Sequence, residues 1–135
     1  MKAKTNVTFL TIIFSLLVSF DLSAQSGVQV HADGKAKVDV YYFHLNTRCA
    51  TCRAIESQAK QYVEELVDMD VSFVAYNLDE AAGEAKGKEL GVMSQTLLVV
   101  KGDKKINLTN EGFLYARTNP EKFKEVIGAK IKPLL

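Results

Sequence analysis

Apolar residues recur along this chain with two different spacings, which separate predicted strands from predicted helices. Strands are predicted where valine, tyrosine, leucine and phenylalanine are concentrated in short runs. These runs are residues 37–44, 71–78, 96–101 and 105–109. The last two runs are separated by Gly102-Asp103, which predicts a tight turn and therefore an antiparallel hairpin.

Helices are predicted between and after these strands. Over residues 49–67 the apolar side chains recur at spacings of three and four, as on one face of a helix. Residues 79–90 predict a shorter helix that Asp79 caps and Gly91 ends. Residues 118–131 begin with Thr-Asn-Pro-Glu, which is typical of a helix start, and continue with an apolar stripe.

The predicted order of elements is βαβαββα, with residues 110–117 as a loop before the last helix. Strands joined by a helix favour parallel pairing, and the closing hairpin adds an antiparallel edge. We therefore expect an α/β domain over residues 37–135, with a central mixed sheet flanked by helices. Residues 25–36 are polar and contain glycine, and we interpret them as a flexible lead-in.

The first residues have the composition of a secretory signal. A basic start with Lys2 and Lys4 precedes a mainly apolar run over residues 7–20, and small and polar residues follow. That run is shorter than the ~20 residues that a membrane span needs. We expect residues 1–24 to be a signal peptide and the mature protein to be exported, either periplasmic or secreted. An uncleaved membrane anchor is the alternative.

Net charge excludes two classes of partner. Removing residues 1–24 takes away two lysines and one aspartate, so 17 basic and 16 acidic side chains become 15 and 15. A neutral chain without a basic stripe has no electrostatic footprint for nucleic acid and no polybasic patch for anionic lipid. We expect a monomer with no nucleic-acid partner and no membrane span after signal removal.

The candidate chemistry lies in the only two cysteines, Cys49 and Cys52, at the junction of the first strand and its helix. Unpaired N–H groups and the helix dipole favour a thiolate there, and Arg48 and Arg53 add positive charge. The i, i+3 spacing places the second sulfur one turn along the same face. We expect Cys49 to be the exposed nucleophile and Cys52 the buried resolving thiol.

A structural disulfide and a zinc site are the alternatives for this pair. A disulfide that closes so short a loop constrains the unfolded chain very little, which disfavours a stabilising role. A closed zinc site needs two more ligands, and the only histidines are His31 in the lead-in and His44 at a strand end. The position of the motif favours redox function, and we expect no metal and no other cofactor.

At these residues the sequence resembles the thioredoxin-like superfamily over residues 38–131. The resemblance rests on VDVYYFHLNTRCATC, VAYNLDE, ELGVMSQTLLVVKGDK and the helix that begins at Pro120. It implies a thioredoxin-like fold and a thiol–disulfide oxidoreductase that acts on protein thiols or disulfides with a further redox partner. The segment RCATCRAIE is also similar to a group of small exported thioredoxin-like proteins, some encoded with arsenic-resistance or nitroreductase genes.

Two departures from the superfamily lie in the motif and in the first strand. Arg48 stands where the family has tryptophan, and Ala50-Thr51 replaces Gly-Pro between the cysteines. These neighbours tune thiolate stability and hence reduction potential. The family's buried aspartate, which takes a proton from the resolving cysteine, aligns with Phe43.

A third departure leaves other functions open. The family's cis-proline packs against the cysteines and helps to keep metals off them. Here Ser94, Gln95 and Thr96 lie at that place, with Gln95 at the proline position. Loss of the proline makes the thiols more available to soft metals. A thiol-dependent metal or metalloid binder is therefore an alternative function, and a non-catalytic subunit of a larger enzyme is another.

The last candidate residues follow the fourth strand. Gly112 resembles the family's glycine beside the substrate groove, and Phe113, Leu114 and Tyr115 come after it. These apolar side chains either line a groove for a client protein or fill the core beneath the last helix. Apolar side chains in most positions are simply buried.

Overall fold

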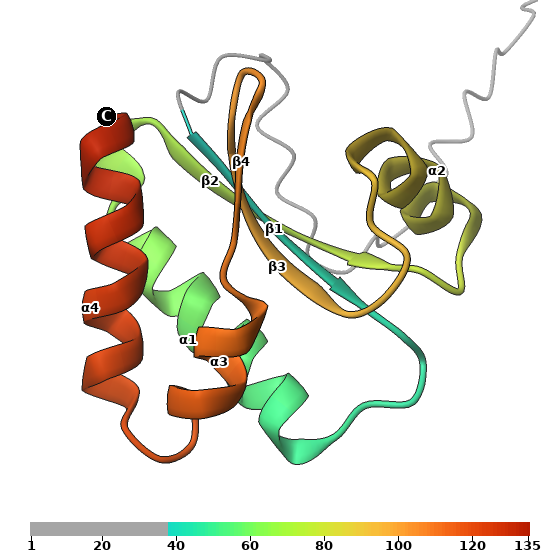
Figure 1. Ribbon diagram of the computed structural model, residues 1–135, viewed down its shortest axis with the longest axis horizontal. Helices are drawn as coiled ribbons and strands as arrows, with labels where there is room; N and C mark the ends of the chain where they lie inside the picture. Colours follow the sequence, from blue (N-terminus) through green and yellow to red (C-terminus); the bar gives the residue numbers. More distant parts are fainter. Residues whose placement is uncertain (1–37) are drawn as a thin grey trace, which may run out of the picture.

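The computed structural model describes residues 38–135, which form a mixed sheet with helices on both faces (Figure 1). The predicted signal peptide (1–24), the lead-in (25–36) and the first residue of the predicted domain lie outside the described residues. The elements are β1 (Val38–His44), α1 (Ala50–Glu64), β2 (Val71–Asn77), α2 (Ala81–Leu90), β3 (Thr96–Lys101), β4 (Lys104–Asn107), α3 (Thr109–Tyr115) and α4 (Pro120–Ile131).

The sheet has the strand order β2-β1-β3-β4. β1 and β2 are parallel and are joined by α1, as predicted. β3 follows the helix α2 but is antiparallel to β1. The expectation that strands joined by a helix are parallel therefore holds for β1 and β2 and not for β3. The reason is that α2 returns the chain to the end of the sheet where β2 leaves it. There Thr96 begins β3 opposite Phe43, whose other neighbour is Tyr76 near the end of β2.

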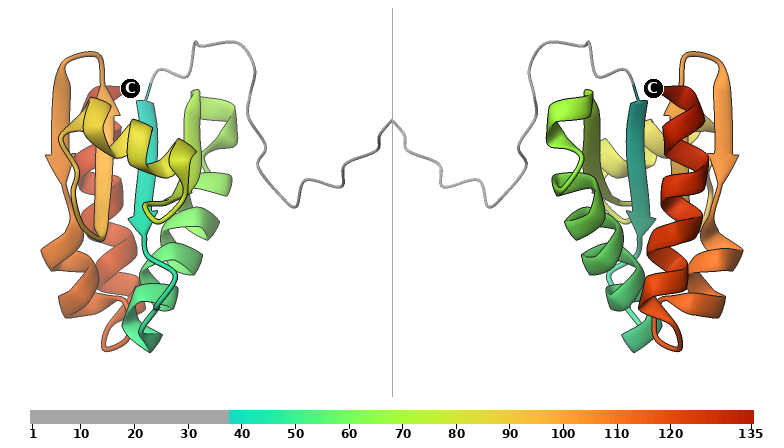
Figure 2. Two further views of the ribbon diagram at one scale, coloured as in Figure 1. Left: turned by 90° about the vertical axis from the view of Figure 1, so that its right-hand side faces the viewer. Right: turned by 90° about the vertical axis from the view of Figure 1, so that its left-hand side faces the viewer.

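Alternate side chains of β1 fill two separate layers. Val38, Val40 and Tyr42 belong to the larger core, which α1 and α4 cover. Phe43 belongs to a smaller core, to which Leu90 of α2 also contributes. Figure 2 shows the sheet face-on, with α2 in front of it and α1 and α4 behind it in the left-hand view, and the reverse in the right-hand view. Because β1 ends at His44 and α1 begins at Ala50, the N-terminus of α1 lies close to the end of β1.

The structure corrects the prediction that residues 110–117 form a loop, because Thr109–Tyr115 is the helix α3. The Asn107 side chain starts this helix by accepting a hydrogen bond of 2.9 Å from the N–H of Thr109. Gly112 then lets α3 pack closely against α1, since a Cβ on this residue would lie 3.0 Å from the Ile55 side chain. Glycine weakens a helix on its own, but here it permits the packing that stabilises one.

Two predicted helix ends also differ from the structure. Asp79 does not cap α2; its carboxylate accepts a 2.6 Å hydrogen bond from the N–H of Asn46, while Glu80 is the N-cap residue. Asp79 therefore connects the β2–α2 loop to the β1–α1 loop. The first helix ends at Glu64, before its predicted end, and a short 3-10 turn over Val67–Met69 follows. Gly91 ends α2 as predicted, with a φ of 74°.

Candidate functional site

Cys49 and Cys52 form a disulfide at the first turn of α1, with their Cα atoms 5.0 Å apart. Cys49 is the N-cap residue of the helix and is exposed, whereas Cys52 is only 5% exposed. The Sγ atom of Cys49 accepts a hydrogen bond of 3.0 Å from the N–H of Cys52. Cys49 is therefore the cysteine of the pair that is open to solvent, and Cys52 is shielded.

Arg48 does not lie beside the disulfide as a free positive charge. Its guanidinium forms an ion pair with Glu56 on α1, and both side chains are mostly buried. The same guanidinium lies over the ring of Tyr42, 5.9 Å from its centroid. Arg53 is exposed on α1, and its N–H donates to the carbonyl of Cys49 at 3.1 Å. The charge of Arg48 near Cys49 is thus largely offset by Glu56.

Tyr42 is the side chain of β1 that reaches the motif, and no sequence motif marks it as a site residue. Its hydroxyl donates a hydrogen bond of 2.8 Å to the backbone carbonyl of Cys52. The same oxygen accepts a 2.7 Å hydrogen bond from Nε2 of Gln95. The only local sign of this role is that Tyr42 continues the alternation of Val38 and Val40 with a polar group.

The loop before β3 is brought to the site through Gln95. Gln95 is half-buried and contacts Tyr42, so the residue at the expected proline position does lie next to the cysteine motif. Ser94 is exposed, and its carbonyl accepts a 2.9 Å hydrogen bond from the hydroxyl of the buried Thr96. Phe43, the residue aligned with the family's aspartate, packs in the smaller core on the α2 side of the sheet.

Burial affects the ionisation of the tyrosine at the site. Burial raises the pKa of Tyr42, and the positive charge of Arg48 opposes that shift only in part. The phenol of Tyr42 therefore keeps its proton at neutral pH. A neutral phenol donates one hydrogen bond, and the carbonyl of Cys52 receives it.

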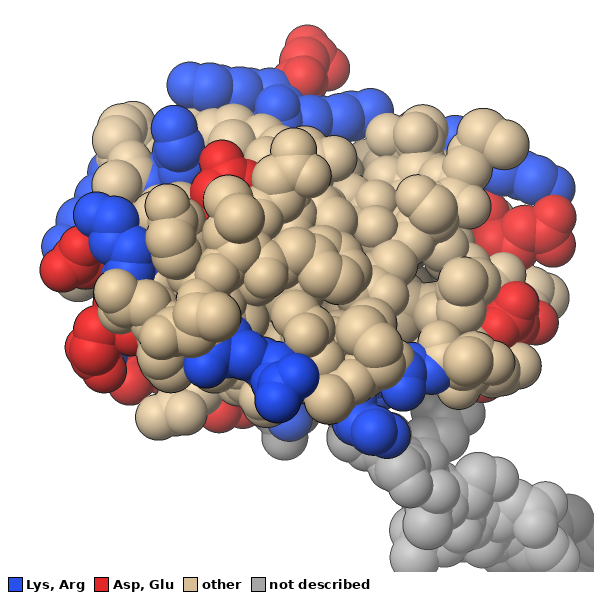
Figure 3. All heavy atoms as spheres, turned by 60° about the horizontal axis from the view of Figure 1, so that its bottom comes forward, with Lys and Arg blue, Asp and Glu red and all other residues tan. Residues whose placement is uncertain are grey.

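α3 presents apolar side chains beside α1. Phe113 is 47% exposed and Leu114 is 61% exposed, so the expectation that these residues fill the core is wrong for both. Tyr115 is partly buried and packs against the larger core. Gly112 is buried against Ile55, one helical turn beyond Cys52. Figure 3 shows the end of the molecule that was lowest in Figure 1, where a broad central area carries no charged side chains.

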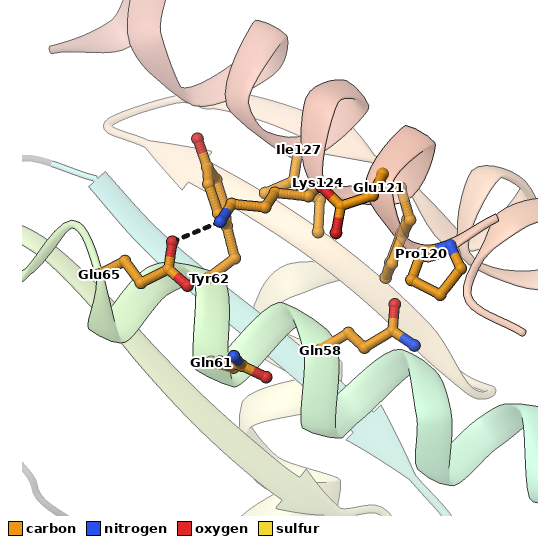
Figure 4. A pocket seen from close by; sticks show the side chains of 9 residues that line it. Gln58, Gln61, Tyr62, Glu65, Pro120, Glu121, Lys124 and Ile127 are labelled. Carbon is orange, nitrogen blue, oxygen red and sulfur yellow. Dashed lines mark ion pairs between the residues drawn. The ribbon is translucent and has the colours of Figure 1, made fainter.

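A groove between α1 and α4 lies apart from the cysteines (Figure 4). Gln58 and Tyr62 line it from α1, and Pro120 and Ile127 line it from α4. Lys124 and Glu65 form an ion pair of 2.6 Å across its edge. Neither cysteine contributes to its lining, so this groove is not part of the redox site.

Three further findings concern residues 38–135. Within this part of the chain, no group of three or more histidine, cysteine, aspartate or glutamate side chains is arranged to hold a metal ion. His44, whose Nδ1 lies 3.2 Å from the carbonyl oxygen of Leu45, stands beside the ring of Tyr42. None of the described helices is long and apolar enough to cross a membrane.

Comparison with known proteins gives structural similarity only. No protein-family model matches the chain, and neither does any curated protein. Among solved structures, Chlamydomonas reinhardtii thioredoxin f2 is similar at 17% identity and a TM-score of 0.43, over 61% of this chain and 77% of that one. A structure described as that of a malarial protein is similar at 19% identity and a TM-score of 0.39, over 50% and 73%.

The architecture itself identifies the fold. The strand order β2-β1-β3-β4 has one parallel and two antiparallel neighbouring pairs, and helices cover both faces. The disulfide occupies the first turn of the helix that follows β1. The chain therefore has an α/β thioredoxin-like fold with a C-x-x-C disulfide at the start of its first described helix.

Proposed function

We propose that the chain is a thiol–disulfide oxidoreductase in which Cys49 exchanges with the client and Cys52 resolves the intermediate. The observation that carries this proposal is the unequal exposure of the two sulfur-bearing residues. Cys49 is exposed at the helix N-terminus, and Cys52 is buried one turn further along. Only one of the two cysteine residues is exposed, which supports an ordered exchange that begins at Cys49.

The oxidised site accepts two electrons from a client dithiol in two exchanges. A client thiolate attacks Sγ of Cys49, forming a client–Cys49 disulfide and releasing Cys52 as a thiolate that takes up a proton. The second client thiolate then attacks the client sulfur of this mixed disulfide and releases Cys49 as a thiolate. The client gains a disulfide, and both cysteines end in the reduced form. Reduction of a client disulfide follows the same steps in reverse.

The helix start favours the thiolate form of Cys49. The N–H of Cys52 already points at this sulfur, at 3.0 Å. Unpaired N–H groups and the helix dipole favour negative charge at such a position. Hydrogen bonds to a charged form lower its pKa, so we expect Cys49 to ionise below the ~8.5 of free cysteine. A low pKa makes Cys49 the better leaving group in the second exchange.

Single cysteine variants test these roles. Cys52→Ser should leave a reactive Cys49 that accumulates mixed disulfides with client proteins on a non-reducing gel. Cys49→Ser should trap almost nothing, because the remaining thiol is buried. The rate of alkylation against pH, measured on each variant, gives the reactivity of each thiol separately. Faster alkylation of Cys52, or equal trapping by both variants, would contradict the assignment.

Export and partners belong to the same proposal. The support for export is the basic start, short apolar run and small-residue exit of residues 1–24. In an exported compartment the protein would act on protein thiols and disulfides, with a separate redox partner that restores its starting state. Mass spectrometry of protein from an exported fraction should show a chain that begins after residue 24 or 26. An intact chain that includes Met1 would contradict this part of the proposal.

A further inference from the structure

Both peptide groups of Cys52 are held by contacts outside the regular helix. Its N–H donates to Sγ of Cys49 at 3.0 Å, and its carbonyl accepts from the hydroxyl of Tyr42 at 2.8 Å. The orientation of residue 52 thus depends on a side chain from β1 as well as on the helix. The N–H and the carbonyl of Cys52 share one Cα atom, so a hydrogen bond that restrains the carbonyl also restrains the residue whose N–H contacts Sγ of Cys49.

Gln95 completes this contact from a third element. Its Nε2 donates to the Tyr42 oxygen at 2.7 Å, so the phenol donates one hydrogen bond and accepts another. The hydroxyl is consequently held in the direction of the Cys52 carbonyl. Three segments that are distant in sequence, β1, the first turn of α1 and the loop before β3, meet at one buried oxygen atom.

We propose that Tyr42 and Gln95 are positioning residues for thiol–disulfide exchange, which together hold the N–H of Cys52 against the sulfur of Cys49. Neither residue reacts. Their effect is to keep a hydrogen-bond donor aimed at the sulfur on which negative charge forms when the disulfide is reduced. This inference rests on the exchange reaction proposed above and specifies how the site stabilises its reduced form.

The surrounding charges do not account for this effect. Besides Tyr42 and the two cysteines, the charged or titratable side chains of β1, the β1–α1 loop, α1 and α3 are Asp39, Tyr41, His44, Arg48, Arg53, Glu56, Lys60, Tyr62, Glu64, Glu111 and Tyr115. Arg48 and Glu56 are paired with each other, and Arg53 is exposed. The hydrogen bonds of Tyr42 are uncharged, so variants that remove them leave this set of charges unchanged.

Tyr42→Phe is the first variant, and Tyr41→Phe is its matched control. Tyr41 is adjacent on β1 but belongs to the smaller core on the opposite face. Loss of one hydrogen bond corresponds to about a fivefold change in an equilibrium constant. In Tyr42→Phe we therefore expect about a fivefold smaller thiolate fraction of Cys49 at a fixed pH below its pKa. The equilibrium with glutathione should shift about fivefold towards the disulfide. Tyr41→Phe should change neither.

Gln95→Met tests whether Gln95 acts through Tyr42. This variant removes the donor and keeps a similar volume at a half-buried loop position, so it also provides a readout if Tyr42→Phe does not fold. We expect a shift in the same direction as Tyr42→Phe but smaller. In the double variant, Gln95→Met should add nothing to the effect of Tyr42→Phe, because the acceptor of its hydrogen bond is already gone.

The outcomes separate this inference from the proposed function. The inference would be overturned if Tyr42→Phe had the same thiolate fraction and the same glutathione equilibrium as wild type. It would also be overturned if the effects of the two substitutions were additive in the double variant. A fall in thermal stability without a change in either thiol measurement would show a merely structural role and would also overturn it. Failure of Cys52→Ser to trap clients, with the shifts in Tyr42→Phe present, would instead contradict the proposed function.

Discussion

Arg48 and Glu56 form an ion pair between the residue that precedes Cys49 and the second turn of α1. Because both side chains are mostly buried, solvent screens this pair less than it screens an exposed one. The pair brings a carboxylate close to the N-terminal end of α1, where a thiolate forms when the disulfide is reduced. Glu56 therefore opposes the positive charge that Arg48 would otherwise supply to Cys49.

Replacement of Glu56 by glutamine should lower the pKa of Cys49. The substitution removes one negative charge near the thiolate and leaves the charge of Arg48 uncompensated. We expect a fall of about one pH unit, which corresponds to about 1.36 kcal/mol of repulsion between Glu56 and the thiolate. The rate of alkylation of reduced protein as a function of pH measures this pKa.

Glu64→Gln is the control for that measurement. Glu64 is the last residue of α1, and its Oε1 lies 3.8 Å from Nζ of Lys60. Glu64→Gln changes the net charge by the same amount as Glu56→Gln. Glu64 is about 20 Å from Cys49 along the helix, which is beyond the screening length of about 10 Å at 0.1 M salt. An equal fall in the Cys49 pKa in both variants would show that net charge matters and the Arg48–Glu56 pair does not.

Gly83→Ala should destabilise the protein more than Gly112→Ala does. A Cβ at residue 83 would lie 1.9 Å from the backbone oxygen of Asn77, so α2 would have to move away from β2. At residue 112 the three atoms nearest to the Cβ would all belong to the side chain of Ile55, at 3.0–3.2 Å.

We expect Gly83→Ala to lower the free energy of unfolding by about 2–3 kcal/mol, although alanine favours a helix by about 1 kcal/mol. Gly112→Ala should cost about 1 kcal/mol, because a buried side chain shifts more easily than a backbone segment. Urea unfolding of the oxidised proteins measures both values. The reverse order would mean that α3 is packed more rigidly than α2.

The elements that the sequence predicted well are those with strong local patterns. Residues 96–101 form β3 with the predicted bounds, because a continuous apolar run in a buried central strand leaves no ambiguity. Pro120 begins α4 and Gly91 ends α2 as predicted, since both residues restrict the backbone locally. The strand-to-helix junction at Cys49 was predictable because a continuous apolar run over residues 37–44 gives way to spacings of three and four over residues 49–67.

The contacts around the disulfide could not be predicted from local pattern. Gln95 and Tyr42 are 53 positions apart, and their hydrogen bond depends on β3 entering the sheet antiparallel to β1. The pairing of Arg48 with Glu56 depends on how the loop before α1 turns. α3 was missed because Gly112 lowers local helix propensity, while its benefit is close packing against Ile55.

Replacement of both Phe113 and Leu114 by serine should slow thiol–disulfide exchange with protein clients but not with small disulfides. These side chains are exposed on α3, beside the helix that carries the cysteines. Burying each partly exposed apolar side chain against a client contributes about 1 kcal/mol, so for the two together we expect roughly a ten- to thirtyfold loss, as about 1.4 kcal/mol is tenfold. Reduction of insulin compared with that of a small aromatic disulfide measures this difference.

Met69→Ser is the control for the α3 surface. Met69 is 50% exposed, but it lies in the 3-10 turn that follows the far end of α1. Its replacement should leave both rates unchanged. A loss of insulin reduction as large as that in the Phe113/Leu114 variant would show that exposed apolar area in general matters, and that α3 has no specific contact with clients.

The stability of the oxidised protein should fall as the pH rises above about 10. Burial raises the pKa of Tyr41 above the ordinary value of 10.0, the negative charge of Asp39 adds to the shift, and Lys86 opposes it. Burial raises the pKa of Tyr42 as well.

The sign of the effect follows from which state ionises first. Below pH 10 both phenols are neutral whether the chain is folded or unfolded, so their contribution to stability is fully present. Between that value and the higher pKa of the folded state, the unfolded chain loses these protons first, which favours unfolding. The contribution is therefore lost as the pH rises through the folded-state pKa.

Tyr41→Phe isolates one phenol, because no hydrogen bond of the described residues involves its hydroxyl. We expect its free energy of unfolding to fall less steeply above pH 10 than that of wild type, with little difference at pH 7. Urea midpoints across this range give the slopes. Phe113→Ser removes no ionisable group and should keep the wild-type slope. A Tyr41→Phe slope equal to that of wild type would mean that the phenol of Tyr41 does not contribute to alkaline unfolding.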